Sequence, residues 1–169
     1  SDHPERVDRL SLVDSACYPF NMPFKGRLPQ LPVIGSFIFK HVYRRPIFRD
    51  YFRNEVFGGA PAFNLDRVDA YYDDFTTVEG RDAAYAILKA TLTDFSPIAD
   101  KIAQIKARTL VVWGENDQIF PRSLAQRLAS DVEKCQLELI AGCGHAPNEE
   151  RPERLADLLM DHHLPADEG

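Results

Sequence analysis

The sequence predicts an α/β fold, in which a small parallel sheet is flanked by helices and interrupted by an inserted helical lid. Outside the lid, stretches typical of strands alternate with stretches typical of helices, and this alternation implies a layered sheet. The middle of the chain differs in composition, because residues 20–95 hold ten of the eleven Phe and five of the six Tyr. We therefore expect an α/β core formed by residues 1–18 and 96–169 and a helical cap or lid formed by residues 19–95.

Three short segments have the composition of buried strands. They span residues 7–13, 108–113 and 136–140. The second is a continuous β-branched and apolar run that ends at Gly114, which is typical of a strand covered on both faces, as in a parallel sheet. The three strands are therefore expected to be mostly parallel.

The predicted helices follow from apolar residues three and four positions apart and from Pro in the first turn. In the lid they cover residues 31–44, 46–57, 66–75 and 81–95. In the core they comprise a short helix that opens at Ser96-Pro97 and carries Ile98, Ile102 and Ile105, then residues 121–132 and 152–163. Residues 142–150 are predicted to form a loop.

Composition excludes several classes of protein. The chain has 169 residues, 44% of them hydrophobic, a net charge of −6 and no apolar stretch long enough to span a membrane. These values argue against disorder and against a nucleic-acid-binding surface, which needs a basic excess. The three cysteines form neither an even disulfide framework nor a metal-binding pair. We expect a reducing, cytoplasmic location, no cofactor and a small-molecule substrate.

Candidate catalytic residues follow the strands, where open α/β sheets bind their ligands. These residues are Asp14, Asp117 and His145. Asp117 ends the turn Gly114-Glu115-Asn116-Asp117, and His145 lies in Gly142-Cys143-Gly144-His145-Ala146-Pro147. Neighbouring strands lie about 4.8 Å apart, so these two loops can bring a carboxylate to an imidazole. The pair would act as an orienting acid and a general base.

These motifs resemble the α/β-hydrolase superfamily over nearly the whole chain. Pro4-Glu5-Arg6-Val7 through Leu12-Val13-Asp14 is similar to its sixth strand, after which many members insert a helical cap. Leu110 through Asp117 with Ile119-Phe120-Pro121 resembles the seventh strand and acid loop, and Ile140 through Pro147 with Glu150-Arg151-Pro152-Glu153 resembles the histidine loop and last helix. The resemblance implies that Asp117 is the triad acid and His145 the triad base.

The nucleophile that the resemblance requires is missing from the sequence. In this family it lies on a G-x-S-x-G-type elbow that precedes the acid and the histidine, and no such elbow exists here. Gly35-Ser36 lies inside the lid, and Ser15 follows the wrong strand. We therefore expect the chain to be the C-terminal part of a larger hydrolase with an ester-type, small hydrophobic substrate, and to be inactive alone. The alternatives are half of a split hydrolase and a non-catalytic binding module.

Other features have structural interpretations that compete with functional ones. Asp117 and His145 could each be ordinary loop residues, and Asp14 occupies a position where some family members carry an alternative acid. Trp113 is expected to be core rather than pocket wall, and Cys143 a packing residue rather than a nucleophile or metal ligand. The basic residues Lys40, Arg45, Arg49 and Arg53 favour a solvated face over an anion-binding one. The free edge of strand 7–13 predicts a homodimer or higher oligomer.

Overall fold

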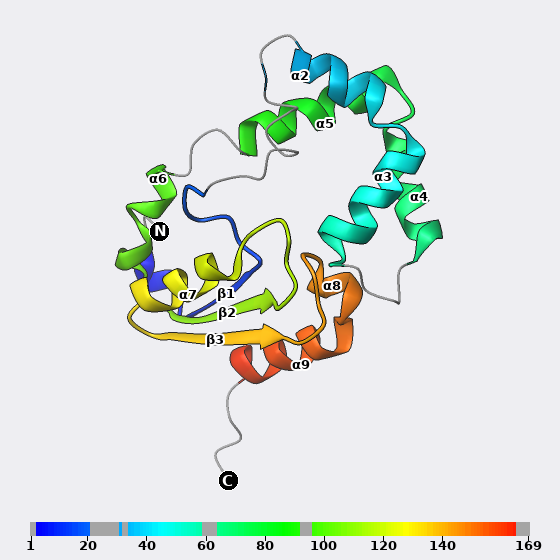
Figure 1. Cartoon of the computed structure of the whole chain (residues 1–169). Coiled ribbons are helices and arrows are strands. Elements are labelled where there is room, and N and C mark those ends of the chain that lie inside the picture. The colour runs from blue at the N-terminus through cyan, green and yellow to red at the C-terminus, as the bar shows by residue number, and fades with distance from the viewer. Residues whose placement is uncertain (1–2, 21–30, 32–33, 59–63, 92–95, 165–169) are drawn as a thin grey trace.

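The core contains a three-stranded parallel sheet. The structure is a computed structural model that describes residues 3–20, 31, 34–58, 64–91 and 96–164. Within them, β1 (Arg9–Val13), β2 (Arg108–Gly114) and β3 (Cys135–Ile140) form a sheet of order β1-β2-β3. Both strand pairs are parallel, so the carboxyl ends of all three strands meet at one edge (Figure 1). The predicted parallel α/β sheet is confirmed.

Helices cover both faces of this sheet. Helix α7 (Arg122–Asp131) lies on one side and α9 (Pro152–His163) on the other (Figure 1). Side chains of β2 alternate between them: Val111 and Trp113 pack in the cluster that includes α7, whereas Leu110 and Val112 pack in the cluster that includes α9. Both faces of β2 are buried, which explains why its sequence is continuously apolar.

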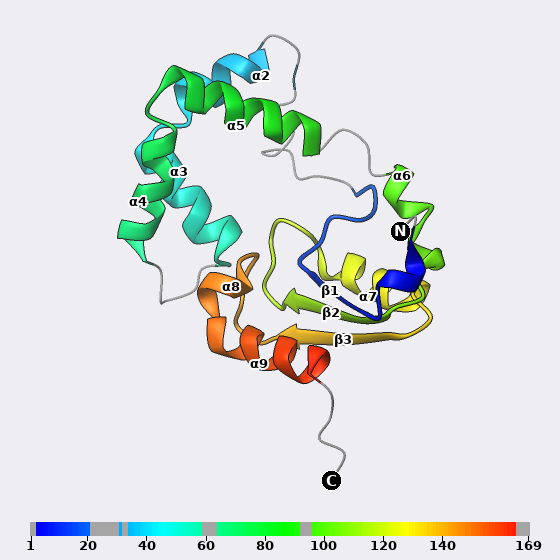
Figure 2. The ribbon, with the colours of Figure 1, turned by 180° about the vertical axis from the view of Figure 1, so that it is seen from behind.

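Helices α2 to α5, which follow β1 in the chain, are here called the helical insert (residues 34–91; Figure 2). It comprises α2 (Ile34–Phe37), the π-helix η3 (Ile38–Val42), α3 (Arg45–Tyr51), the π-helix η4 (Phe52–Val56), α4 (Leu65–Asp74) and α5 (Val78–Thr91). Aromatic rings hold it together. Phe48 stacks on Phe52 and contacts Tyr72 and Phe75. The aromatic residues of this segment therefore act as structural anchors.

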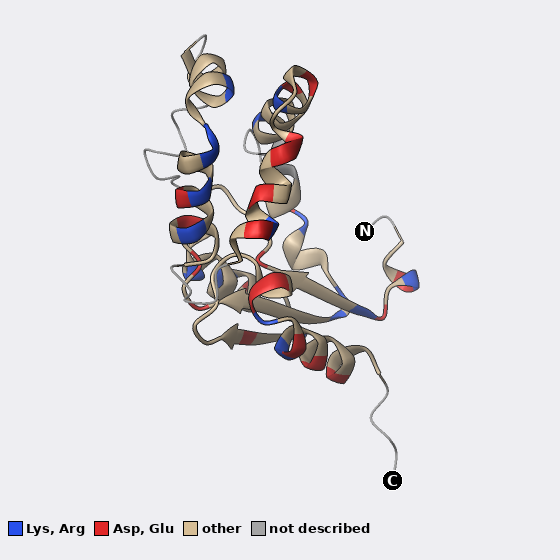
Figure 3. Ribbon diagram, turned by 90° about the vertical axis from the view of Figure 1, so that its right-hand side faces the viewer, with Lys and Arg blue, Asp and Glu red and all other residues tan. Residues whose placement is uncertain are grey.

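Ion pairs join the helices of the insert. Arg45 pairs with Asp73 at 2.6 Å, Arg49 pairs with Asp69, and Lys40 pairs with Asp82 at 2.6 Å. Figure 3 shows basic and acidic residues together along these helices. Three members of the predicted basic stripe are thus neutralised by carboxylates on neighbouring helices, which leaves no net positive face among them for an anionic ligand.

Several predicted boundaries differ from the structure. The first strand begins at Arg9 rather than residue 7, because Pro4–Arg6 form a 3-10 turn (η1) and Val7 is exposed. The predicted loop 142–150 contains a short helix, α8 (Pro147–Glu150), since Pro147 occupies the first helical position.

The remaining helix predictions are partly correct. The predicted helices 31–44 and 46–57 each break into an α and a π segment. The helix expected from Ser96 divides into α6 (Ser96–Ala99) and the 3-10 turn η5 (Ile102–Gln104). Helix α5 starts at Val78, three residues before the predicted start at residue 81, and the predicted end at residues 92–95 lies outside the described residues. Helix α9 has the predicted bounds.

Three further features concern membrane-spanning helices, the edge of β1 and the cysteines. Among the described residues, no helix combines the length and apolar character needed to cross a membrane. Within that same part of the chain, β1 pairs only with β2, so its outer edge lacks a strand partner. Cys17, Cys135 and Cys143 are free thiols in the structure.

Candidate active site

The acid loop and the histidine loop lie in contact at the carboxyl ends of β2 and β3. A Cβ on Gly114, the last residue of β2, would lie 1.8 Å from the carbonyl oxygen of Gly144. Only glycine therefore permits the two loops to approach this closely. The backbone adds two bonds, because Glu115 N–H donates to the Ile140 carbonyl at 3.0 Å and Asn116 N–H donates to the Cys143 carbonyl at 2.8 Å.

The carboxylate of Asp117 is fixed by its own loop. Its Oδ1 accepts the backbone N–H groups of Ile119 at 2.7 Å and Phe120 at 2.9 Å. The side chain is fully buried. The two bonds are those of an ordinary loop Asp that caps its own turn, so this alternative role of Asp117 is also present. Because Oδ1 is used in the turn, Oδ2 is left to face the histidine loop.

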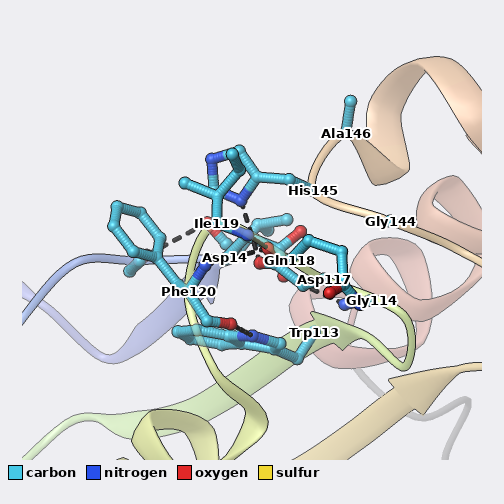
Figure 4. Close-up of polar contacts among 12 residues, drawn as sticks. Asp14, Trp113, Gly114, Asp117, Gln118, Ile119, Phe120, Gly144, His145 and Ala146 are labelled. Atoms are coloured by element: carbon cyan, nitrogen blue, oxygen red, sulfur yellow. Dashed lines mark hydrogen bonds and ion pairs between the residues drawn. The ribbon is translucent and has the colours of Figure 1, made fainter. Parts of the chain in front are cut away.

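His145 completes the contact. Its Nδ1 lies 2.9 Å from Asp117 Oδ2, and one quarter of its side chain is exposed (Figure 4). A carboxylate accepts only, so the neutral imidazole donates through Nδ1 and keeps Nε2 as an acceptor. Among the described residues, Nε2 has no hydrogen-bond partner in protein. This is the arrangement that a general base with an orienting acid requires.

Aromatic residues support the imidazole. The Phe120 ring meets the His145 ring edge-on, with centroids 4.9 Å apart (Figure 4). Trp113, fully buried in β2, donates its Nε1–H to the Phe120 carbonyl at 3.1 Å. Trp113 thus lies in the core beneath the site, as predicted, and fixes the segment that carries Phe120.

The backbone around His145 is held from two sides. The carboxylate of Glu150 accepts the Gly144 N–H at 2.9 Å and the Ala146 N–H at 3.1 Å. The His145 N–H donates instead to the carbonyl of Val56, at the end of η4 in the helical insert, at 2.5 Å. The sequence predicted neither partner. Glu150 belongs to the motif that resembles the start of the last helix, but the motif does not indicate these bonds, and no sequence signal places Val56 beside His145.

Asp14 lies next to this pair without bonding to His145. It directly follows β1 and has a left-handed φ of 39°, and its Oδ1 accepts the Gly114 N–H at 2.9 Å. Its Oδ2 is buried and has no hydrogen-bond partner among the described residues. Burial, with the nearby charge of Asp117, raises the pKa of Asp14 to about 7 despite the Gly114 bond. His145 therefore pairs with Asp117, and Asp14 supports the start of the acid loop.

The three side chains Asp14, Asp117 and His145 each place one ligand atom within 4.8 Å of the others. Such a set could hold a metal ion. However, Nδ1 of His145 and both oxygens of Asp117 already have partners within the chain. We therefore interpret the cluster as an acid–base pair. Cys143 is fully buried, and burial raises the pKa of its thiol to about 12, as expected of a packing residue.

Comparison with known proteins identifies a family for the chain as a whole. The sequence model of the Alpha/beta hydrolase family matches residues 5–158. Human monoacylglycerol lipase ABHD6 is 41% identical over 58 residues, which are 34% of this chain and 17% of that protein. The 2-hydroxy-6-oxononadienedioate/2-hydroxy-6-oxononatrienedioate hydrolase of Paraburkholderia xenovorans is 23% identical over 94% of this chain and 54% of its own length. The chain thus spans about half of that relative.

Solved structures agree on the fold. A 2-hydroxy-6-oxo-6-phenylhexa-2,4-dienoate hydrolase from a Rhodococcus species matches with a TM-score of 0.75 and 19% identity. The match covers 95% of this chain and 57% of that structure. An N-acyl homoserine lactone degrading enzyme, Est816, matches with a TM-score of 0.65 and 23% identity, over 95% of this chain and 60% of its own.

Proposed function

Because the chain belongs to the α/β-hydrolase family, we propose that it supplies the acid and the base of a hydrolase whose complete form cleaves an ester-type bond of a small hydrophobic substrate. The observation that carries this proposal is the bond from His145 Nδ1 to Asp117 Oδ2, with Nε2 left as an acceptor at the carboxyl edge of the sheet. Asp14, the other acid considered, bonds the Gly114 amide instead.

In the proposed mechanism, His145 Nε2 takes a proton from the nucleophile, or from water where the nucleophile is a carboxylate. The same nitrogen later returns a proton to the leaving group. Asp117 holds the imidazole in the required tautomer and stabilises its cation. The turn bonds to Asp117 Oδ1 keep Oδ2 aimed at His145 while the charge develops.

The nucleophile is proposed to come from a segment outside these 169 residues. The sequence has no G-x-S-x-G elbow. The hydroxyl of Ser15 bonds the Val13 carbonyl at 3.1 Å rather than a catalytic partner. The 169-residue chain alone is therefore expected to have no esterase activity.

An ester-type substrate is supported by the 41% identity to a monoacylglycerol lipase, over about a third of this chain. The helical insert is proposed to act as the cap of the enzyme, because its aromatic interior reaches the histidine loop: Phe48, Phe57 and Val68 share a buried cluster with Ala146. Another relative is the Paraburkholderia 2-hydroxy-6-oxononadienedioate/2-hydroxy-6-oxononatrienedioate hydrolase, so a bond other than an ester is the alternative target. Half of a split hydrolase and a non-catalytic binding module are the competing functions.

The test is hydrolysis of p-nitrophenyl esters by the full-length protein and its His145→Ala variant. We expect the substitution to lower kcat by at least about 10³-fold, as loss of a triad base does. His163→Ala is the matched control, since His163 contacts Ser11 on the surface and should leave kcat unchanged. Equal rates for wild type and His145→Ala would remove His145 from the mechanism, and absence of turnover in all three proteins would favour a binding module.

A further inference from the structure

We infer that the end of the helical insert, residues Val56–Gly58, positions the imidazole of His145, and that Gly58 is the positioning residue that makes this contact possible. The inference rests on the proposed role of His145 as the base. It adds that the base depends on the seating of the insert as well as on the sheet beneath it.

The first observation is the backbone bond between the two segments. The His145 N–H donates to the Val56 carbonyl at 2.5 Å. The amides on either side, Gly144 and Ala146, both donate to Glu150, which belongs to the core. The insert therefore binds the one backbone amide of this run that belongs to the proposed base itself.

The second observation is the close contact of two glycines. Gly58 has a left-handed φ of 52°, and a Cβ there would lie 2.9 Å from the Asn116 carbonyl oxygen and 3.3 Å from Gly144 Cα. A Cβ on Gly144 would lie 2.4 Å from the Val56 carbonyl oxygen. Glycine on both sides thus lets the insert touch the histidine loop and the acid loop at once.

Side chains hold the insert in this place. Phe57 is 6% exposed and belongs to the same buried cluster as Ala146. The hydroxyl of Tyr71, on α4, donates to Glu149 of α8 at 2.6 Å. Figures 1 and 2 both place the end of α3 and η4 beside α8. A displacement of the insert would therefore pull on the backbone of His145 and change its approach to Asp117.

The test compares Gly58→Ala with Gly142→Ala by amide hydrogen exchange and by NMR of the His145 imidazole. Gly142 has a similar φ of 62°, but a Cβ there meets only Arg151 Nη2 at 3.4 Å, so this control carries the backbone strain without the clash. Gly58→Ala should speed exchange of the His145 amide by about five- to tenfold, the loss of one ordinary hydrogen bond, and should shift the Nδ1–H resonance. The Glu115 amide, bonded within the core, should not change.

Tyr71→Phe is the second variant, because it loosens the insert without adding bulk. It should accelerate exchange of the His145 amide in the same direction as Gly58→Ala, by a smaller factor. If neither variant changes the His145 amide or imidazole signals more than Gly142→Ala does, the insert does not position His145. These measurements need no turnover, so they stand apart from the ester assay: loss of the His145→Ala effect there would refute the proposed base and leave the contact itself intact.

Discussion

The α/β core and the helical insert are built by different interactions. In the core, β2 is buried on both faces and its neighbours are joined by a regular parallel ladder. In the insert, short helices are held by stacked rings and by ion pairs, such as those of Arg45 with Asp73 and Phe48 with Phe52. The strands of the core are held by regular backbone hydrogen bonds, whereas the helices of the insert are held by individual side-chain contacts.

This difference has a consequence for the site. Asp117 and His145 stand on loops of the core, whose positions are set by the strands and by the Gly114–Gly144 approach. The insert reaches the same place through the Val56 carbonyl, which accepts the His145 N–H, and through Gly58, which lies against Asn116 and Gly144. The hydrogen bonds that the Asp117 carboxylate accepts within the described residues thus come from the core, whereas His145 is bonded by the core and by the insert.

The largest effect on stability is expected at Asp14, in the core. Its pKa of about 7 in the folded chain lies above the ordinary value of 3.8, so the folded state binds more protons between these two values. Asp14 therefore stabilises the folded state most below about pH 4, where it is neutral. As pH rises to about 7, this contribution to the free energy of unfolding falls by at most about 4 kcal/mol. Asp14→Asn, which keeps the acceptor for Gly114, should therefore gain stability over wild type as pH rises through this range.

The control for this experiment is Asp8→Asn, because the Asp8 side chain is 89% exposed just before β1. Urea unfolding at a series of pH values measures all three proteins. A difference between Asp14→Asn and wild type that stays constant with pH would mean that the pKa of Asp14 is the same in the folded and unfolded protein.

A smaller effect tests whether the two regions unfold separately. Val111 in β2 and Val68 in α4 are both fully buried, so truncation of each to Ala should cost about 2 kcal/mol. Amide hydrogen exchange measures the result. Val111→Ala should lower the protection of amides from exchange throughout the chain. Val68→Ala should lower it in the insert and at the His145 amide only. Equal loss of protection in β2 from both variants would show that core and insert unfold as one unit.

The smallest effect concerns the free edge of β1. An unpaired strand edge invites pairing with another copy, so the chain is expected to form dimers or higher oligomers. Light scattering at tens of micromolar measures the molar mass of the species in solution and so tests this expectation. A compact monomer at that concentration would contradict the expectation.

Sequence periodicity predicted the core better than the insert for a physical reason. The strand Arg108–Gly114 is buried on both faces and leaves a continuous apolar run, and the helix Pro152–His163 buries one face and leaves a periodic apolar pattern. The insert changes to π segments after Phe37 and Tyr51. Rings in these segments pack against rings of other helices, as Phe39 does with Tyr85 and Phe52 with Tyr71, and local sequence does not encode such partners. Likewise, strand ends predicted that Asp117 and His145 meet, but the Val56 contact joins segments 89 positions apart and has no sequence signal.

Asp117 is proposed to orient His145 as a base. A long-range ¹H–¹⁵N NMR spectrum of the imidazole, recorded above neutral pH, tests it most directly because it identifies which ring nitrogen carries the proton. The structure predicts that Nδ1 is protonated toward Asp117 and Nε2 is not, and that Asp117→Ala removes this preference. A wild-type ring protonated mainly at Nε2, or one unaffected by Asp117→Ala, would contradict the claim.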